Sequence, residues 1–154
     1  HIAMHGFAKI TLFFCAGAIF TVTQKTEISQ LNGIGRKMPV TMVAFTIGAI
    51  ALIGLPPFGG AWSKYYLVLG TLDRGSYVLL AVLLASSLLN VFYFLPIIIR
   101  AFYPTNSIKS FPKNTITEAP VLQLIAISIT ALGCIGLFIY PQFVFNLLRS
   151  LVGL

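Results

Sequence analysis

Charged side chains are scarce in this chain of 154 residues, at 8% against about a quarter in typical soluble domains. Acidic groups are the rarest, with three Asp and Glu residues against ten Lys and Arg residues. Hydrophobic residues make up 58% of the chain, and its mean hydropathy is +0.96. So few charges cannot cover a surface that faces water. The composition therefore excludes an ordinary soluble domain and predicts a membrane protein.

Signatures of enzyme chemistry are also missing. Glu27, Asp73 and Glu118 all lie in polar connectors, and there is no phosphate-binding glycine loop, GxSxG motif or cluster of metal ligands. Cys15 and Cys134 lie inside apolar runs and indicate no disulfide framework. We expect no catalytic residue, cofactor or metal. The net charge of +7 does not predict a nucleic-acid partner, because the basic residues lie mostly between apolar runs.

Four apolar stretches are long enough to cross a bilayer, which takes about 20 helical residues. They cover residues 1–23, 39–72, 76–101 and 120–148. The expected fold is an all-α membrane protein of about four transmembrane helices. We expect three spans within 1–104, a loop at 105–118 and a final helix within 119–154. Because the chain begins with His1 inside a helical pattern, we interpret it as a fragment or a late-starting gene product.

Basic residues gather in alternate connectors. If all four stretches span, one side carries Lys25, Arg36, Lys37, Arg100, Lys109 and Lys113, and the other carries Arg74 and Arg149. The positive-inside rule then predicts that connectors 24–38 and 102–118 are cytoplasmic and that the C-terminus faces outward.

His1, His5 and Lys9 recur at a spacing of four, which places them on one face of a helix. Histidine titrates near neutral pH, and burial disfavours the charged form of lysine. Intramembrane ionisable residues are costly and usually face polar cavities, so we expect this row to conduct protons. The alternative is that the histidines lie at the membrane interface and Lys9 extends toward water.

The stretch "IGLPPFGGAWSKYYL" predicts a break in the second span from Leu55 to Trp62, because proline removes a backbone donor and clashes with the preceding turn. The residues expected to break the helix are Pro56, Pro57, Gly59 and Gly60. Broken helices recur at ion and proton sites of transporters, which makes Lys64 a candidate proton carrier. The alternative is an ordinary turn at the membrane edge, with Trp62 in an aromatic belt and Lys64 as an interfacial anchor.

A further polar set could line a shared cavity. Ser86, Asn90 and Tyr93 lie on one helical face of the third span, and Ser63 precedes Lys64. The alternative is helix–helix packing through small and polar side chains.

Three motifs together resemble the proton-translocating antiporter family. They are H-x3-H-x3-K followed by "LFFCAGAI", then G-x-G-R-x-M-P, then "ALIGLPPFGGAWSK". This family includes antiporter-like subunits of respiratory complex I and the large subunits of Mrp-type cation/proton antiporters. The sequence is most similar to that of D-type Mrp subunits, and the similarity is strong from His1 to about Tyr103.

The resemblance implies a fold of about fourteen helices with two inverted repeats, of which this chain supplies part of the second. It implies proton translocation through His1, His5, Lys9 and Lys64 in a bacterial cell membrane. The implied partners are other subunits of the complex, lipid, protons and Na⁺ or K⁺. The alternatives are a proton-pumping subunit of a complex I-type oxidoreductase or membrane hydrogenase, and a truncated scaffold without transport. The sequence does not identify the cation or the partner subunits.

Overall fold

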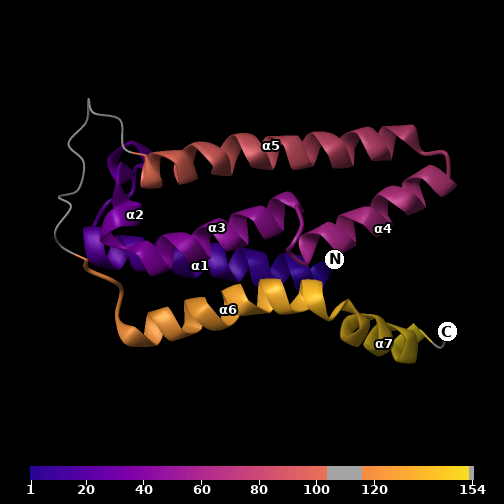
Figure 1. Cartoon of the computed structure of the whole chain (residues 1–154). Coiled ribbons are helices and arrows are strands. Elements are labelled where there is room, and N and C mark those ends of the chain that lie inside the picture. The colour runs from indigo at the N-terminus through magenta and orange to yellow at the C-terminus, as the bar shows by residue number, and fades with distance from the viewer. Residues whose placement is uncertain (104–115, 153–154) are drawn as a thin grey trace.

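The chain folds into an elongated bundle of helices (Figure 1), here a computed structural model that describes residues 1–103 and 116–152. The helices are α1 (Ile2–Thr23), α2 (Ile34–Lys37), α3 (Pro39–Ile53), α4 (Gly60–Asp73), α5 (Tyr77–Phe102), α6 (Val121–Ile139) and α7 (Pro141–Val152), with a 3-10 turn, η1, at Ile28–Leu31. The described residues form no strand, so the predicted all-α class is confirmed.

Three of these helices, α1, α5 and α6, are long and apolar enough to cross a membrane. The remaining predicted span is divided into two helices, α3 and α4, separated by residues 54–59. Figure 1 shows α4 continuing the general course of α3 beyond this interruption. The predicted discontinuous second span is therefore confirmed. Its interruption ends earlier than Trp62, because the helix resumes at Gly60.

Residues 119–154 contain two helices where one was expected. α6 ends at Ile139 and α7 begins at Pro141, at an angle to α6 in Figure 1. Proline has no backbone N–H to donate, and its ring clashes with the preceding turn of a continuous helix.

The core lies where α1 packs against α3 and α6. Small side chains allow close approach: Ala8, Cys15, Ala18 and Ala49 are almost fully buried. At Gly48 an added Cβ would lie 3.2 Å from Leu12 Cγ, so this position favours glycine. α5 packs differently from α1, because no residue in its most hydrophobic stretch is buried inside the bundle. Its outer face is therefore available to lipid or to other polypeptide.

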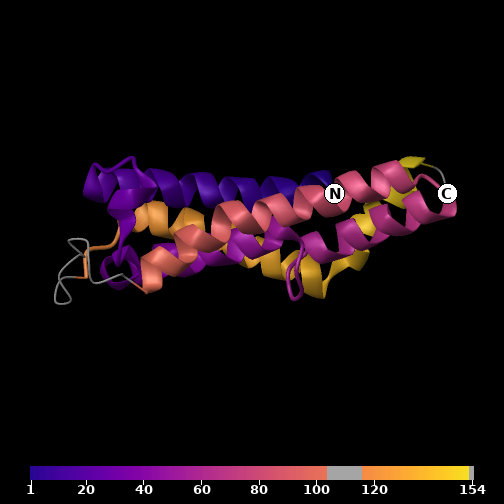
Figure 2. The ribbon, with the colours of Figure 1, turned by 90° about the horizontal axis from the view of Figure 1, so that it is seen from above.

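The connector before α3 lies at the same end of the bundle as the end of α5 and the start of α6, and Figures 1 and 2 agree on this. Two backbone hydrogen bonds join this end: Gly33 N–H donates to Arg100 O at 2.9 Å, and Thr117 N–H donates to Lys37 O at 2.9 Å. Arg74 lies at the opposite end, between α4 and α5. Lys109, Lys113, most of the expected loop 105–118 and the side chain of Arg149 lie outside the described residues.

Candidate functional site

The break between α3 and α4 leaves the last carbonyl groups of α3 without helical partners. Gly54 ends α3 with φ +88°, a left-handed conformation that favours glycine. The N–H groups of Gly54 and Leu55 both donate to Ile50 O, at 3.0 and 3.2 Å. The Ile53 carbonyl, one of the last in α3, is therefore available to another donor.

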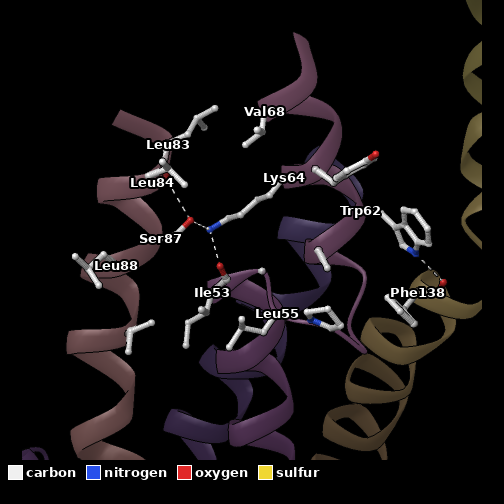
Figure 3. Close-up of a pocket in the computed structure, with 15 residues that line it drawn as sticks. Ile53, Leu55, Trp62, Lys64, Val68, Leu83, Leu84, Ser87, Leu88 and Phe138 are labelled. Atoms are coloured by element: carbon white, nitrogen blue, oxygen red, sulfur yellow. Dashed lines mark hydrogen bonds between the residues drawn. The ribbon is translucent and has the colours of Figure 1, made fainter. Parts of the chain in front are cut away.

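Lys64 supplies that donor from the first turns of α4. Its ammonium donates to Ile53 O at 2.8 Å and to Ser87 Oγ of α5 at 2.6 Å (Figure 3). The C-terminal end of a helix carries partial negative charge, so α3 favours a cation here. Within the described part of the chain, both hydrogen-bond partners of this ammonium are neutral groups.

Two glycines make this arrangement sterically possible. A Cβ added at Gly54 would lie 2.5 Å from Lys64 Cδ, so the lysine stem passes directly over this glycine. A Cβ added at Gly60 would overlap the Ala51 carbonyl oxygen, so the start of α4 rests on the backbone of α3. Gly60, predicted as a residue of the break, is the first residue of α4 and lies against the backbone of α3.

Lys64 borders a cavity of about 710 Å³ between the broken span and α5. Most of its walls are apolar, and Val68, Leu83, Leu84 and Leu88 are among the residues that line it (Figure 3). A charge among such side chains is stable only when it is hydrogen-bonded, which the two oxygen partners of Lys64 provide.

The row on α1 reaches the same turn of α4 from the other side. The rings of His1 and His5 lie 5.4 Å apart, and His1 Nδ1 is 2.9 Å from Ser63 Oγ. Ser63 is buried and its hydroxyl donates to Gly60 O at 3.0 Å, so its oxygen is placed to accept from the His1 ring. Adjacent residues of α4 thus contact α1 on one side and α5 on the other.

Only one residue of the row is half-buried. His1 and Lys9 are exposed, whereas His5 is half-buried and interacts electrostatically with both Lys9 and Lys64. Among the described residues, no three His, Cys, Asp or Glu side chains gather as a metal site requires.

Two hydrogen bonds fix the break against α6. Gly59 N–H donates to Cys134 O at 3.1 Å, and Trp62 Nε1–H donates to Phe138 O at 3.1 Å. Phe138 lies next to Ile139, where α6 ends, so Trp62 links the start of α4 to the end of α6. The indole N–H is thus used for a contact between helices of the bundle.

The third span contributes a different polar residue from those that the spacing favoured. Ser86 and Tyr93 are exposed and Asn90 is half-buried; none of them lines the cavity beside Lys64, whereas Ser87 does. Neighbouring helical positions differ by about 100°, so Ser86 and Ser87 cannot both face α4. The spacing identifies a helical face, but only the packing shows which face meets Lys64.

Comparison with known proteins gives a consistent family. Residues 1–90 match the family described as NADH:quinone oxidoreductase/Mrp antiporter, TM. The chain is 46% identical over 102 residues to NADH-quinone oxidoreductase subunit N of Desulforudis audaxviator, covering 66% of this chain and 20% of that protein. It is 33% identical over 133 residues to the D-type component of a Na(+)/H(+) antiporter of Alkalihalophilus pseudofirmus, covering 84% and 27%.

Two solved structures share the fold. A chain in the Mrp complex from Dietzia sp. DQ12-45-1b matches with a TM-score of 0.77 at 22% identity, over 92% of this chain and 34% of that one. A chain in respiratory complex I from Thermus thermophilus matches with a TM-score of 0.66 at 24% identity, over 94% and 34%. The chain thus spans a fifth to a third of the length of the proteins it matches.

Proposed function

Because this chain belongs to the NADH:quinone oxidoreductase/Mrp antiporter transmembrane family, we propose that it forms part of a membrane subunit that translocates protons through Lys64. One observation carries the proposal. Lys64 lies at the break of a membrane span, in an apolar cavity, with a helix C-terminus and a hydroxyl as its partners. A lysine held by neutral groups has no fixed counter-charge, so nearby charges can shift its protonation in either direction.

The row on α1 would relay protons to or from this lysine. His1 and His5 are close enough to exchange a proton through an intervening water, and His1 is hydrogen-bonded to the residue before Lys64. The electrostatic interaction of His5 with Lys9 and Lys64 lets a proton on one group discourage a proton on the next. Such mutual repulsion favours movement of charge along the row.

For the complete protein we propose exchange of Na⁺ or K⁺ for protons. The support is the similarity to the D-type component of a Na(+)/H(+) antiporter, which extends over 84% of this chain. A cation that entered a cavity near Lys64 would disfavour the ammonium form and release its proton. Coupling would therefore be electrostatic and would need no shared binding site.

A second candidate is a proton-pumping subunit that quinone reduction drives. The observation that favours it is the 46% identity to NADH-quinone oxidoreductase subunit N, which extends over 102 aligned residues. The lysine and histidine chemistry is the same in both cases, and the two differ in what drives the charge changes.

We also propose that other polypeptide covers the outer face of α1 in a bacterial cell membrane. Lys9 is exposed in an apolar helix, and placing a charged side chain in lipid has a free-energy cost of about 3 kcal/mol. The proteins similar to this chain are subunits of multi-subunit complexes. Connectors 24–38 and 102–118 would be cytoplasmic, as the positive-inside rule predicts.

The test uses inverted membrane vesicles that carry the native complex containing this chain. The vesicles are energised, the pH gradient is followed with a quenched dye, and Na⁺ or K⁺ is then added. Lys64→Ala is compared with Lys64→Arg, which keeps the positive charge but cannot release its proton. Lys25→Ala, outside the apolar spans, is the control.

Antiport predicts that either cation collapses the gradient in the native and Lys25→Ala vesicles and that both Lys64 variants fail, with normal amounts of complex. Collapse at the native rate in Lys64→Ala would refute the role of this lysine. No response to cations, together with NADH-driven proton uptake that Lys64→Ala abolishes, would support the second candidate. Neither activity in the native vesicles would indicate a scaffold without transport.

A further inference from the structure

We propose that Ser87 positions the Lys64 ammonium and sets the pH range in which the proton carrier operates, an inference that rests on the proposed function of Lys64. Ser87 Oγ lies 2.6 Å from Lys64 Nζ, which is shorter than the 2.8 Å contact to Ile53 O. Figure 3 shows the ammonium between these two oxygens, one from α5 and one from the end of α3.

Ser87 is the one polar side chain that α5 presents to the cavity. The other α5 residues that line it are Leu83, Leu84, Leu88 and Val91. The hydroxyl is itself held in place, because it donates to Leu83 O at 3.1 Å one turn earlier. Its lone pairs are therefore turned to the ammonium while its hydrogen is satisfied within α5.

A hydroxyl can serve both protonation states of the lysine. When Lys64 is charged, the ammonium donates to Ser87 Oγ, as the structure has it. When Lys64 is neutral, rotation of the hydroxyl away from Leu83 O lets it donate to the amine lone pair. The Ile53 carbonyl can only accept, so it cannot bind that lone pair.

The charged state gains more from this contact, because hydrogen bonds to ionised groups are about twice as strong as those between neutral groups. Loss of the hydroxyl therefore disfavours the ammonium. Transport that requires a protonated Lys64 should then need a lower pH, by about one unit for one hydrogen bond to a charge.

Other titratable groups near α4 must be kept constant in the test. On the described helices packed against α4, the titratable or charged side chains are His5, Lys9 and Cys15 of α1, with His1 just before it, Tyr77, Tyr93 and Arg100 of α5, and Cys134 of α6. α4 itself carries Tyr65, Tyr66 and Asp73, and Arg74 follows it. A change at Ser87 removes none of them, so a shifted pH profile reports on the contact between Ser87 and Lys64.

The experiment measures the pH profile of proton translocation in vesicles carrying the native complex, by whichever driving force is active in them. Ser87→Ala removes the hydroxyl, and Ser87→Thr retains it. Ser86→Ala is the matched control, because Ser86 is the adjacent serine of the same helix and is exposed. Ser87→Cys, with a weaker acceptor of similar size, gives a second informative variant.

We expect Ser87→Ala to move the profile about one unit toward lower pH, Ser87→Cys to move it less, and the other two variants to follow the native profile. A native profile in both Ser87→Ala and Ser87→Cys would overturn the inference, as would a Thr variant displaced as far as Ala. If Lys64→Ala is inactive in the same vesicles while Ser87→Ala and Ser87→Cys have native profiles, only the proposed role of Ser87 fails. If Lys64→Ala is fully active, the proposed function itself fails.

Discussion

At the scale of the residue, the candidate site depends on what a few positions lack. Gly54 has no Cβ, so α3 can end in a left-handed conformation and the stem of Lys64 can cross it. Ile53 lies in the last turn of a helix, so its carbonyl has no helical partner and can bind an ammonium. The site is built as much from backbone as from side chains.

Gly54→Ala tests the steric part of this description. The substitution places a non-glycine residue at φ +88° and a Cβ 2.5 Å from Lys64 Cδ, which is too close for both atoms to keep their places. Displacement of the ammonium by about an ångström is expected to slow transport about tenfold or more. The assay is the vesicle pH-gradient measurement, normalised to the amount of assembled complex.

Gly70→Ala is the matched control for that substitution. Gly70 lies in α4, and a Cβ there meets nothing within 4 Å, so native activity is expected. Gly54→Asn separates two causes, because asparagine tolerates the left-handed conformation yet still carries a Cβ. Native activity in Gly54→Asn would mean that backbone strain, and not contact with the lysine, explains the Ala variant.

At the scale of the element, α3 is stabilised by a residue far away in the sequence. It begins at Pro39 without a capping side chain of its own. The Glu118 carboxylate accepts from Val40 N–H at 2.7 Å and from Thr41 Oγ1 at 2.8 Å. A carboxylate is favourable at this position, because the N-terminal end of a helix carries unpaired N–H groups and partial positive charge.

Glu118→Ala should therefore destabilise the protein by about 1 kcal/mol, the usual effect of losing a helix cap. The measurement is thermal unfolding of the detergent-solubilised complex. Glu27→Ala is the control, because Glu27 is exposed and bonds only locally to Ser29, at 3.1 Å. Equal unfolding temperatures in the two variants would show that the distant cap contributes nothing.

At the scale of the whole molecule, the basic connector between α1 and α3 lies at one end, with the end of α5 and the start of α6, and the turn between α4 and α5 lies at the other. The chain therefore has two ends that would face opposite sides of a membrane. The burial of Cys15 and Cys134 provides a low background for labelling with thiol reagents.

Thr26→Cys and Asp73→Cys use this background to test the orientation. Both positions are exposed and they lie at opposite ends of the bundle. A membrane-impermeant thiol reagent should label Thr26→Cys in inverted vesicles and Asp73→Cys in spheroplasts or protoplasts. Labelling of both from the same side would contradict the arrangement, and the reverse pattern would contradict the cytoplasmic assignment alone.

The motifs allowed a large part of the fold to be predicted. Helical class, apolar spans and a break in the second span follow from local composition, because bilayer thickness sets helix length and proline removes backbone donors. The division of the last stretch at Pro141 was missed, although the same proline rule applies there. The family was also correctly identified from short motifs within residues 1–90.

The sequence by itself determined that this chain lies in a membrane, that its second span is broken and that a lysine follows the break. Those properties depend on residue type and order alone. Only the tertiary structure decided that Ser87 faces Lys64 while Ser86 does not, and that the carbonyl of Ile53 completes the site. The physical reason is that a helical pattern fixes angles around one axis, whereas a contact also depends on the rotation and distance of the helix beside it.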